Sequence, residues 1–368
     1  MGENKSVKEI IFKIYAISLI VGFVVVIANP SIASSSVERG MVVCANIIIP
    51  PIFLSSIVSN LLYYTGALKV LSPLIKGISK LFNVSFEGAQ IFLISMLGGY
   101  PSGAALIKEA VKLKTITAEE AKKLSLFCLC GGPAFIIGAV GYKIFSNISF
   151  GIVLYICSVI SNMTVALLLR GKGPQSDPKG LYTHTTRSFS ECLISSVNSA
   201  VSSLLPMCGF IIFFTSVNYF VSAFGVFDKF GEIFDLENHI TRLISAAFFS
   251  ASEVTSGTLC AKEIGGYIGA LLCAFCVSFS GICIHFQVYS LLSDIKISRL
   301  RFLLSRFISA TITTLFLFPI LLSDDGLVPV LSVNKAFTLS YNSLISSFFI
   351  ILLSVSLVFS VKSNSFTE

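Results

Sequence analysis

Long apolar runs constrain this chain more than any other feature. Residues 10–29, 149–169, 302–322 and 342–361 each extend for about 20 residues with almost no charge, the length that an α-helix needs to cross about 30 Å of hydrocarbon. Of all residues, 54% are hydrophobic and 12% charged, and the mean hydropathy is +0.88. The sequence therefore predicts an all-α polytopic membrane protein, multi-pass in a bacterial inner membrane, with the lipid bilayer as its first partner. Residues 10–29 are interpreted as a retained helix, because the run is longer than a signal-peptide core and lacks a clean cleavage site.

Composition argues against several other classes of protein. The ten cysteines lie in or beside apolar stretches, so they are interpreted as packing residues and not as a disulfide framework. Cys128-x-Cys130 and Cys273-x-x-Cys276 lack a matching pair in a soluble loop, so no metal site is predicted. The net charge of +7 is spread over short loops, so nucleic acid is not an expected partner. No catalytic triad, zinc-protease motif or Walker loop occurs, so we expect neither an enzyme nor a bound cofactor.

The placement of basic residues orients the chain. Lys5, Lys8 and Lys13 place the N-terminus in the cytoplasm, and most of the 26 Lys and Arg fall on the same side of the resulting topology. The expected elements are an external loop at 30–39, a span at 40–63 bent at Pro50-Pro51, an interfacial helix at 64–82, a broken segment at 86–111, spans at 124–142 and 149–169, an amphipathic stretch at 189–204, a span at 205–227, an acidic external loop at 228–238, a broken segment at 240–263, a span at 267–292 and a cytoplasmic turn at 294–301. The expected organisation is an N-terminal helix and loop (1–39), a first repeat (40–169), a cytoplasmic linker (170–188), a second repeat (189–322) and an external loop with a C-terminal helix (323–368).

Two apolar segments are interrupted by helix-breaking and polar residues. GGYPSGAALIKE (98–109) interrupts the first, and SEVTSGTLCAKE (252–263) interrupts the second. Each half-segment is too short to span a bilayer, so we expect two re-entrant hairpins. At an offset of 154 residues, Ser102-Gly103 aligns with Ser256-Gly257, and Lys-Glu follows in both copies. Inverted repeats with broken helices are the architecture of secondary transporters; chance similarity between apolar segments is the alternative.

The interruptions suit a solute-binding site. Glycine lets the backbone turn and approach a ligand, proline fits the first turn of a new helix, and Ser or Thr can cap its free N–H groups. A half-helix that begins inside the membrane directs partial positive charge at its neighbour, which suits a small anion or polar heterocycle. The alternative is that the breaks only allow close helix packing. The predicted substrate-binding residues are Gly99, Tyr100, Pro101, Ser102, Gly103, Glu253, Thr255, Ser256 and Gly257.

Several further residues are candidates for gating or support. A carboxylate such as Glu253 inside an apolar segment costs roughly 2.5 kcal/mol or more, so it is expected to bind substrate donors or a coupling proton, or else to make a structural hydrogen bond to Thr255. Lys108 and Lys262 either attract anions or extend to the interface. Gly131-Gly132-Pro133 breaks the segment 124–142 and loosely matches Ser280-Gly281; either pair could form an unwound wall of the site or a hinge. The last candidate is His285, which is either a proton relay or a packing residue.

Three motifs carry a resemblance to a known family. They are G-Y-P-S-G-A at Gly99 to Ala104, G-P-x-F-I-I-G at Gly132 to Gly138, and E-V-T-S-G at Glu253 to Gly257. Over about residues 40–320 the chain resembles the YlbJ-like (SpoVV) sporulation integral membrane proteins of the nucleoside-recognition or Gate group. The chain departs from the pattern at Ala104-Ala105, where a lysine is expected.

The resemblance implies a plan similar to that of concentrative nucleoside transporters, whose paired hairpins hold the substrate. It implies transport during spore formation, with dipicolinic acid as the solute and the outer forespore membrane as the location. Transport of nucleosides stays open, as does a metal ion held by Cys128, Cys130 or His285, and so does a non-transporting sporulation scaffold. The sequence also leaves the coupling ion, the direction of transport and a homo-oligomeric state open.

Overall fold

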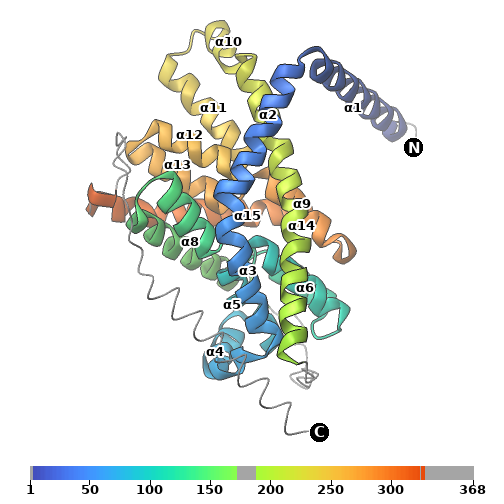
Figure 1. Ribbon diagram of the computed structural model, residues 1–368, viewed down its shortest axis with the longest axis vertical. Coiled ribbons are helices and arrows are strands. Elements are labelled where there is room, and N and C mark those ends of the chain that lie inside the picture. The colour runs from blue at the N-terminus through green and yellow to red at the C-terminus, as the bar shows by residue number, and fades with distance from the viewer. Residues whose placement is uncertain (1–2, 172–187, 324, 328–368) are drawn as a thin grey trace.

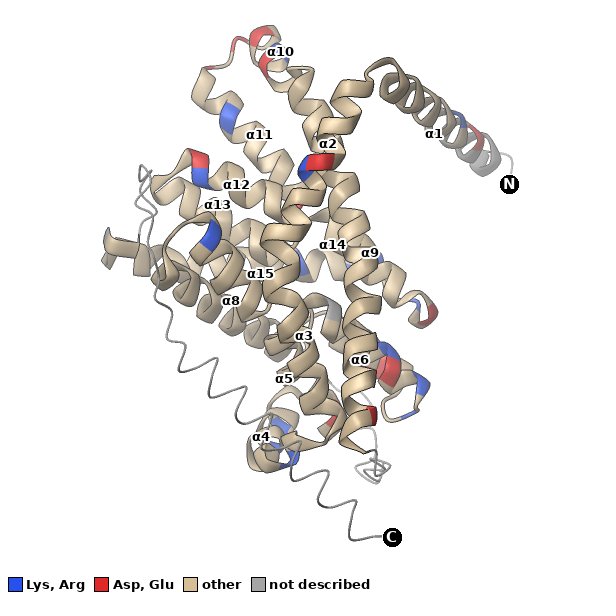
Figure 2. Ribbon diagram, viewed as in Figure 1, with Lys and Arg blue, Asp and Glu red and all other residues tan. Residues whose placement is uncertain are grey.

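The fold is built from helices of very different lengths (Figure 1). The computed structural model describes residues 3–171, 188–323 and 325–327. By length and composition, five helical stretches of this described part could cross a membrane, or six if a pair bent by 103° (67–82 and 86–98) is counted as one span. The five are Pro30–Tyr64, Ile148–Leu168, Phe189–Ala223, Gly266–Leu291 and Arg299–Ser323. In Figure 2, charged residues gather on the short helices α4 (Ser72–Phe82) and α10 (Val226–Ile233) and near the end of α6 (Tyr100–Lys112).

The two halves present their elements in the same order: a long helix, a short amphipathic helix, a two-helix hairpin, an interrupted helix and a second long helix. The first half, after α1 (Glu3–Ala28), comprises α2 (Pro30–Val43), the π-helical η1 (Cys44–Ile48), α3 (Ile49–Tyr64), η2 (Ala67–Leu71), α4 (Ser72–Phe82), α5 (Phe86–Gly98), α6 (Tyr100–Lys112), α7 (Ala118–Ser125), the π-helical η3 (Ala134–Ile144) and α8 (Ile148–Leu168). The second half comprises α9 (Phe189–Ala223), α10 (Val226–Ile233), α11 (Asn238–Ser252), α12 (Val254–Ile264), α13 (Gly266–Phe279), α14 (Gly281–Leu291), η4 (Ser293–Ile295), α15 (Arg299–Ser323) and η5 (Asp325–Leu327).

The predicted helices at 10–29, 149–169 and 302–322 are confirmed as α1, α8 and α15. The predicted helix at 342–361 and most of the linker at 170–188 lie outside the described residues. In Figure 1, α1 projects away from the rest of the protein and meets it only where it joins α2.

The predicted external loop at 30–39 is wrong, because these residues are helical in α2. Pro30 occupies the first turn, where its missing N–H is not needed, and the hydroxyl of Ser36 donates to the carbonyl of Ala33 within the same helix. Burial of Ser36 and Gly40 against α9 supplies the packing that keeps this serine-rich stretch helical.

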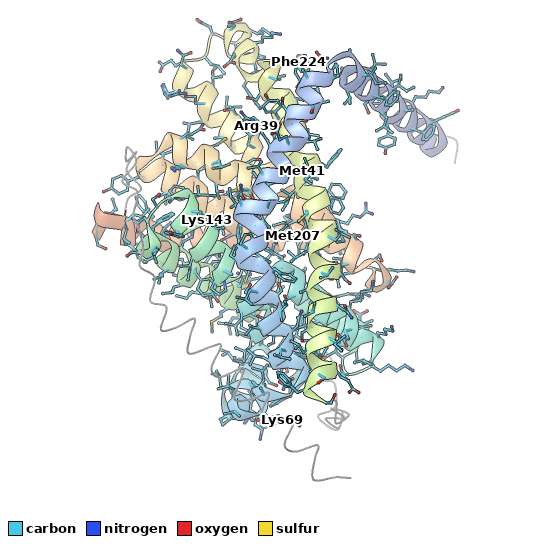
Figure 3. The ribbon with its side chains drawn as sticks, in the orientation of Figure 1. Arg39, Met41, Lys69, Lys143, Met207 and Phe224 are labelled. Carbon is cyan, nitrogen blue, oxygen red and sulfur yellow. The ribbon has the colours of Figure 1, made fainter. Side chains whose placement is uncertain are left out.

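Two stretches of 35 residues, Pro30–Tyr64 and Phe189–Ala223, pack side by side and antiparallel (Figure 1). The guanidinium of Arg39 lies over the Tyr219 ring, 4.7 Å from its centroid (Figure 3). One residue further, a Cβ at Gly40 would lie 2.8 Å from Cα of Ile212, so only glycine allows this approach. The separately predicted segments 189–204 and 205–227 are therefore one continuous helix, α9, which contains Pro206.

The bend predicted at Pro50-Pro51 takes the form of a π-helical turn just before the prolines. The N–H of Ile49 bonds to the carbonyl of Cys44, five residues earlier. Proline cannot donate to the carbonyl four residues before it, and the carbonyl that Pro50 leaves free, that of Asn46, accepts from Nζ of Lys143.

One predicted break is confirmed and one predicted loop is wrong. The break predicted at Gly131-Gly132-Pro133 within 124–142 is present and begins earlier than expected, because α7 ends at Ser125 and the π-helical η3 begins at Ala134. The acidic loop predicted at 228–238 is largely helix α10, because its apolar face packs on α11, where the rings of Phe227 and Phe249 meet at 5.6 Å.

Candidate functional site

Both predicted interruptions are breaks between two packed helices. Gly99 separates α5 from α6 and has φ +80° and ψ −170°, a conformation that side-chain-bearing residues rarely adopt. Glu253 separates α11 from α12 in an extended conformation, with φ −146° and ψ 130°. The sequence therefore located the two breaks correctly. The backbone conformation differs between them, with a positive φ at Gly99 and an extended residue at Glu253.

Each break is covered by a glycine of the following interrupted helix. A Cβ at Gly132 would lie 2.9 Å from both the Gly99 nitrogen and the Leu97 oxygen. In the second half, a Cβ at Gly281 would lie 3.1 Å from the Ser252 oxygen and 3.3 Å from Cα of Glu253. Gly132 and Gly281 thus occupy matching positions, in agreement with the loose correspondence predicted from sequence.

The interiors of the two hairpins also match. A Cβ at Gly103 would lie 2.5 Å from Oγ of Ser95 on the preceding helix, and one at Gly257 would lie 2.7 Å from Oγ of Ser250. These two glycines serve packing within their hairpins, which is the alternative that the sequence left open for them.

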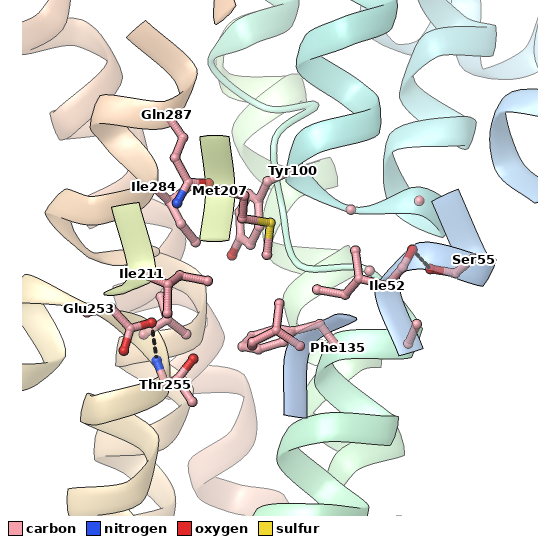
Figure 4. Close-up of a pocket in the computed structure, with 16 residues that line it drawn as sticks. Ile52, Ser55, Tyr100, Phe135, Met207, Ile211, Glu253, Thr255, Ile284 and Gln287 are labelled. Atoms are coloured by element: carbon pink, nitrogen blue, oxygen red, sulfur yellow. Dashed lines mark hydrogen bonds between the residues drawn. The ribbon is translucent and has the colours of Figure 1, made fainter. Parts of the chain in front are cut away.

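A single cavity connects the two breaks (Figure 4). Its volume is about 30 Å³, which is room for about two water molecules. The cavity is contracted in the sense that it admits only molecules of about the size of water. The cavity is lined by Ile48, Ile52, Ser55, Gly98, Gly99, Tyr100, Gly132, Ala134, Phe135, Met207, Ile211, Glu253, Val254, Thr255, Ile284 and Gln287.

Glu253 caps the helix that it precedes. Its two carboxylate oxygens accept hydrogen bonds from the backbone N–H groups of Thr255 at 2.8 Å and Ser256 at 2.6 Å, and the residue is only 2% exposed. A carboxylate at this point complements the partial positive charge of the helix N-terminus. The anion position that the sequence predicted at the start of α12 is therefore occupied by the protein's own carboxylate.

Tyr100 ties the first break to the second half of the chain. Its hydroxyl donates to the carbonyl of Val277 at 2.7 Å and accepts from Oγ of Ser280 at 2.8 Å. Ser280 has φ +78° and separates α13 from α14, so the predicted span 267–292 is interrupted there. Tyr100 thereby satisfies a carbonyl at the end of α13.

Other predicted residues lie away from the cavity. Ser102 does not cap α6, and its buried Oγ has no hydrogen-bond partner among the described residues. Lys108 instead pairs with Asp294 at 3.8 Å, and Lys262 is exposed near the end of α12. His285 Nδ1 lies 2.6 Å from the Gly281 carbonyl oxygen, and its ring packs against Phe302. Gly103, Gly131, Pro133, Ser256 and Gly257 are not among the residues that line the cavity. The side chain of Pro101 lies outside the described part of the structure.

Sequence reasoning missed two kinds of residue. The first is the apolar wall from the long helices, including Ile52, Met207 and Ile211, whose side chains look like ordinary membrane-helix residues. The second is Arg306, fully buried in α15, which donates from Nη1 to the Leu129 carbonyl and from Nη2 to the Leu126 carbonyl at 2.6 Å. A lone arginine within an apolar run was the available signal.

No cluster of three or more His, Cys, Asp or Glu suited to a metal ion occurs among the described residues. Of the cysteines considered for a metal, Cys130 contacts the sulfur of Met96 at 3.3 Å in the hydrophobic interior.

These features define a helical, multi-pass membrane protein with two hairpin breaks that share one buried cavity. The sporulation integral membrane protein YlbJ of Bacillus subtilis (strain 168) is similar to this chain, with 26% identity over 321 residues, which cover 79% of this chain and 78% of the Bacillus protein. This similarity confirms the resemblance to the YlbJ-like sporulation membrane proteins. The chain matches no family model and no solved structure.

Proposed function

We propose that this protein is a secondary transporter of a small anionic or heterocyclic solute, most simply dipicolinic acid during spore formation. The observation that carries the proposal is the cavity shared by the breaks at Gly99 and Glu253, which lie 154 residues apart in sequence. Solute sites in secondary transporters lie where broken helices of two inverted repeats meet. The relative's sporulation role supports the setting of the proposal.

The two halves act as inverted repeats in this proposal. The matched element order, the antiparallel pair of 35-residue helices and the equivalent positions of Gly132 and Gly281 support this relation. The hairpins α5–α6 and α11–α12 are re-entrant, with the N-terminus in the cytoplasm and, in a sporulating cell, the protein in the outer forespore membrane. The solute enters after the halves move apart, because the contracted cavity admits only water.

The test is uptake of radiolabelled dipicolinate into proteoliposomes, with nucleosides as competing solutes. We expect saturable dipicolinate uptake by the wild type and a loss of uptake in Glu253→Gln. Ser55→Phe should also lose uptake, because Ser55 lines the cavity from α3. Its matched control is Leu54→Phe, the neighbouring residue, which is 64% exposed on the outer surface and should leave uptake unchanged.

The outcome separates transport from the alternatives. Nucleoside uptake without dipicolinate uptake would reassign the substrate within the same fold. No flux of any tested solute through correctly folded protein would contradict transport and favour a sporulation scaffold, for which Ser55→Phe and Leu54→Phe would be equivalent.

A further inference from the structure

Arg306 is a buried cation without a counter-charge. It is 0% exposed in the membrane-spanning helix α15, and its two hydrogen-bond acceptors are the neutral carbonyls of Leu126 and Leu129. Within residues 3–171, 188–323 and 325–327, its Nε has no hydrogen-bond partner and none of the ion pairs includes Arg306. The guanidinium faces the Phe302 ring, 5.9 Å from the ring centroid. In this part of the chain, the positive charge therefore has an aromatic neighbour but no acidic partner.

Holding two carbonyls does not require a charge. Neutral amide donors could satisfy them, whereas a permanent cation in an apolar interior is costly and usually serves a function that uses the charge. Arginine also stays protonated in proteins, so it cannot neutralise itself as lysine can.

The guanidinium lies behind the wall of the cavity. Cys130 directly follows Leu129, whose carbonyl accepts from Arg306, and the Cys130 carbonyl oxygen would lie 3.8 Å from a Cβ at Gly99, which lines the cavity next to Tyr100. The segment that Arg306 holds also leads directly into the cavity, because Gly132 follows Leu129 by three residues and forms part of the lining. In Figure 4, the Tyr100 ring lies in the middle of the lining residues.

The acidic group of the cavity does not cancel this charge. Among the described residues that line the cavity, Glu253 is the one acidic residue, and both of its carboxylate oxygens accept N–H bonds at the start of α12. A solute near Tyr100 therefore experiences an unpaired positive charge through a medium that screens it poorly.

We propose that Arg306 is a positioning residue whose buried charge makes the cavity prefer anionic solutes over neutral solutes of the same shape. This inference rests on the proposed function, because it assumes that the cavity binds a solute. Arg306 does not touch the solute. It acts through the positive electrostatic potential near Tyr100 and by holding the backbone conformation of residues 126–132.

The test compares equilibrium binding of dipicolinate with that of pyridine-2,6-dicarboxamide, its neutral isostere, to the purified full-length protein. We expect the wild type to prefer the dianion by at least about tenfold. Arg306→Lys should weaken the preference and lower the thermal stability, because a buried lysine can lose its proton and lacks the two-pronged donor. Arg306→Gln should abolish the preference.

A second variant covers the case in which Arg306→Gln does not fold. Cys130 directly follows Leu129, whose carbonyl accepts from the guanidinium, so Cys130→Asp supplies the missing counter-charge and leaves Arg306 in place. It should abolish the preference, while the neutral control Cys130→Asn keeps it. Retention of the wild-type preference in Cys130→Asp or in folded Arg306→Gln would overturn the inference. Equal binding of both probes to the wild type would overturn it while leaving solute binding intact, and binding of neither would contradict the proposed function as well.

Discussion

Gly132→Ala should destabilise the protein through a clash between backbones. The new Cβ would lie 2.9 Å from the Gly99 nitrogen, 2.9 Å from the Leu97 oxygen and 3.2 Å from the carbonyl carbon of Gly98. Cβ atoms essentially never approach other heavy atoms within 3.0 Å, and no side-chain rotation can relieve this contact because all three neighbours are backbone atoms. Either the hairpin break or the segment 126–132 must move.

The magnitude follows from packing. Overpacking a filled interior costs typically about 1–3 kcal/mol, and the adjacent cavity of about 30 Å³ offers little space for relaxation. The upper part of that range is expected, because Arg306 anchors the same segment at Leu126 and Leu129. Dipicolinate uptake should fall with stability, since Gly132 and Gly99 both line the cavity.

The assay is thermal unfolding in a fixed detergent, followed by uptake in proteoliposomes. Gly138→Ala is the matched control in the π-helical η3, because its Cβ would meet only the Pro51 side chain, at 3.7 Å. Alanine is also favoured over glycine in helices by up to about 1 kcal/mol, so this control should be neutral or stabilising. Equal unfolding midpoints for Gly132→Ala and Gly138→Ala would refute the proposed contact.

Three further substitutions probe the same region. Gly281→Ala should cost about 1–2 kcal/mol, because φ is +60° there and a Cβ would meet the Ser252 oxygen at 3.1 Å; an unfolding midpoint equal to that of wild type would contradict the matched role of the two glycines. Tyr100→Phe should lower the free energy of unfolding by about 1–3 kcal/mol, because the Val277 carbonyl loses its buried donor. If Tyr100→Phe lowers that free energy by the same amount in a Ser280→Ala background, the hydrogen bond from Ser280 contributes little. Glu253→Gln should destabilise α12 by about 1–3 kcal/mol, because an amide can accept only one of the two N–H bonds; faster hydrogen exchange at Thr255 and Ser256 is the readout, and unchanged protection would argue against capping.

The sequence predicted the features that depend on local chemistry. Apolar length identified α8 and α15, and the stretches Gly98 to Gly103 and Glu253 to Gly257 each contain the hairpin break that was predicted there. The predicted residues Gly99, Tyr100, Glu253 and Thr255 do line one cavity. Their convergence is what the proposed inverted repeat predicts, because equivalent positions of inverted repeats meet near a common axis.

The features that depend on distant partners could not be predicted. The break at Gly131-Gly132-Pro133 was predicted, but its extension back to residue 126 was not, because the carbonyls of Leu126 and Leu129 bond to an arginine 180 and 177 residues later. Residues 30–39 look like a loop and are helical, because Gly40 fits against Ile212 of α9. Ser102 has the residue type of a cap, but the break falls at Gly99. Ser102 therefore lies inside the first turn of α6, and its hydroxyl does not cap the helix.

The bonds from Arg306 to the first half have a consequence for biosynthesis. Chains grow at roughly 5–20 residues per second, so about 9–35 s separate the synthesis of Leu129 from that of its donor, Arg306, 177 residues later. During that interval the first half resides in the membrane with two carbonyls awaiting their arginine, an arrangement that hydrocarbon tolerates poorly. The first half is therefore a client for insertion factors until α15 arrives, and a ribosome stalled before residue 306 should leave a nascent chain that membrane proteases recognise as incomplete.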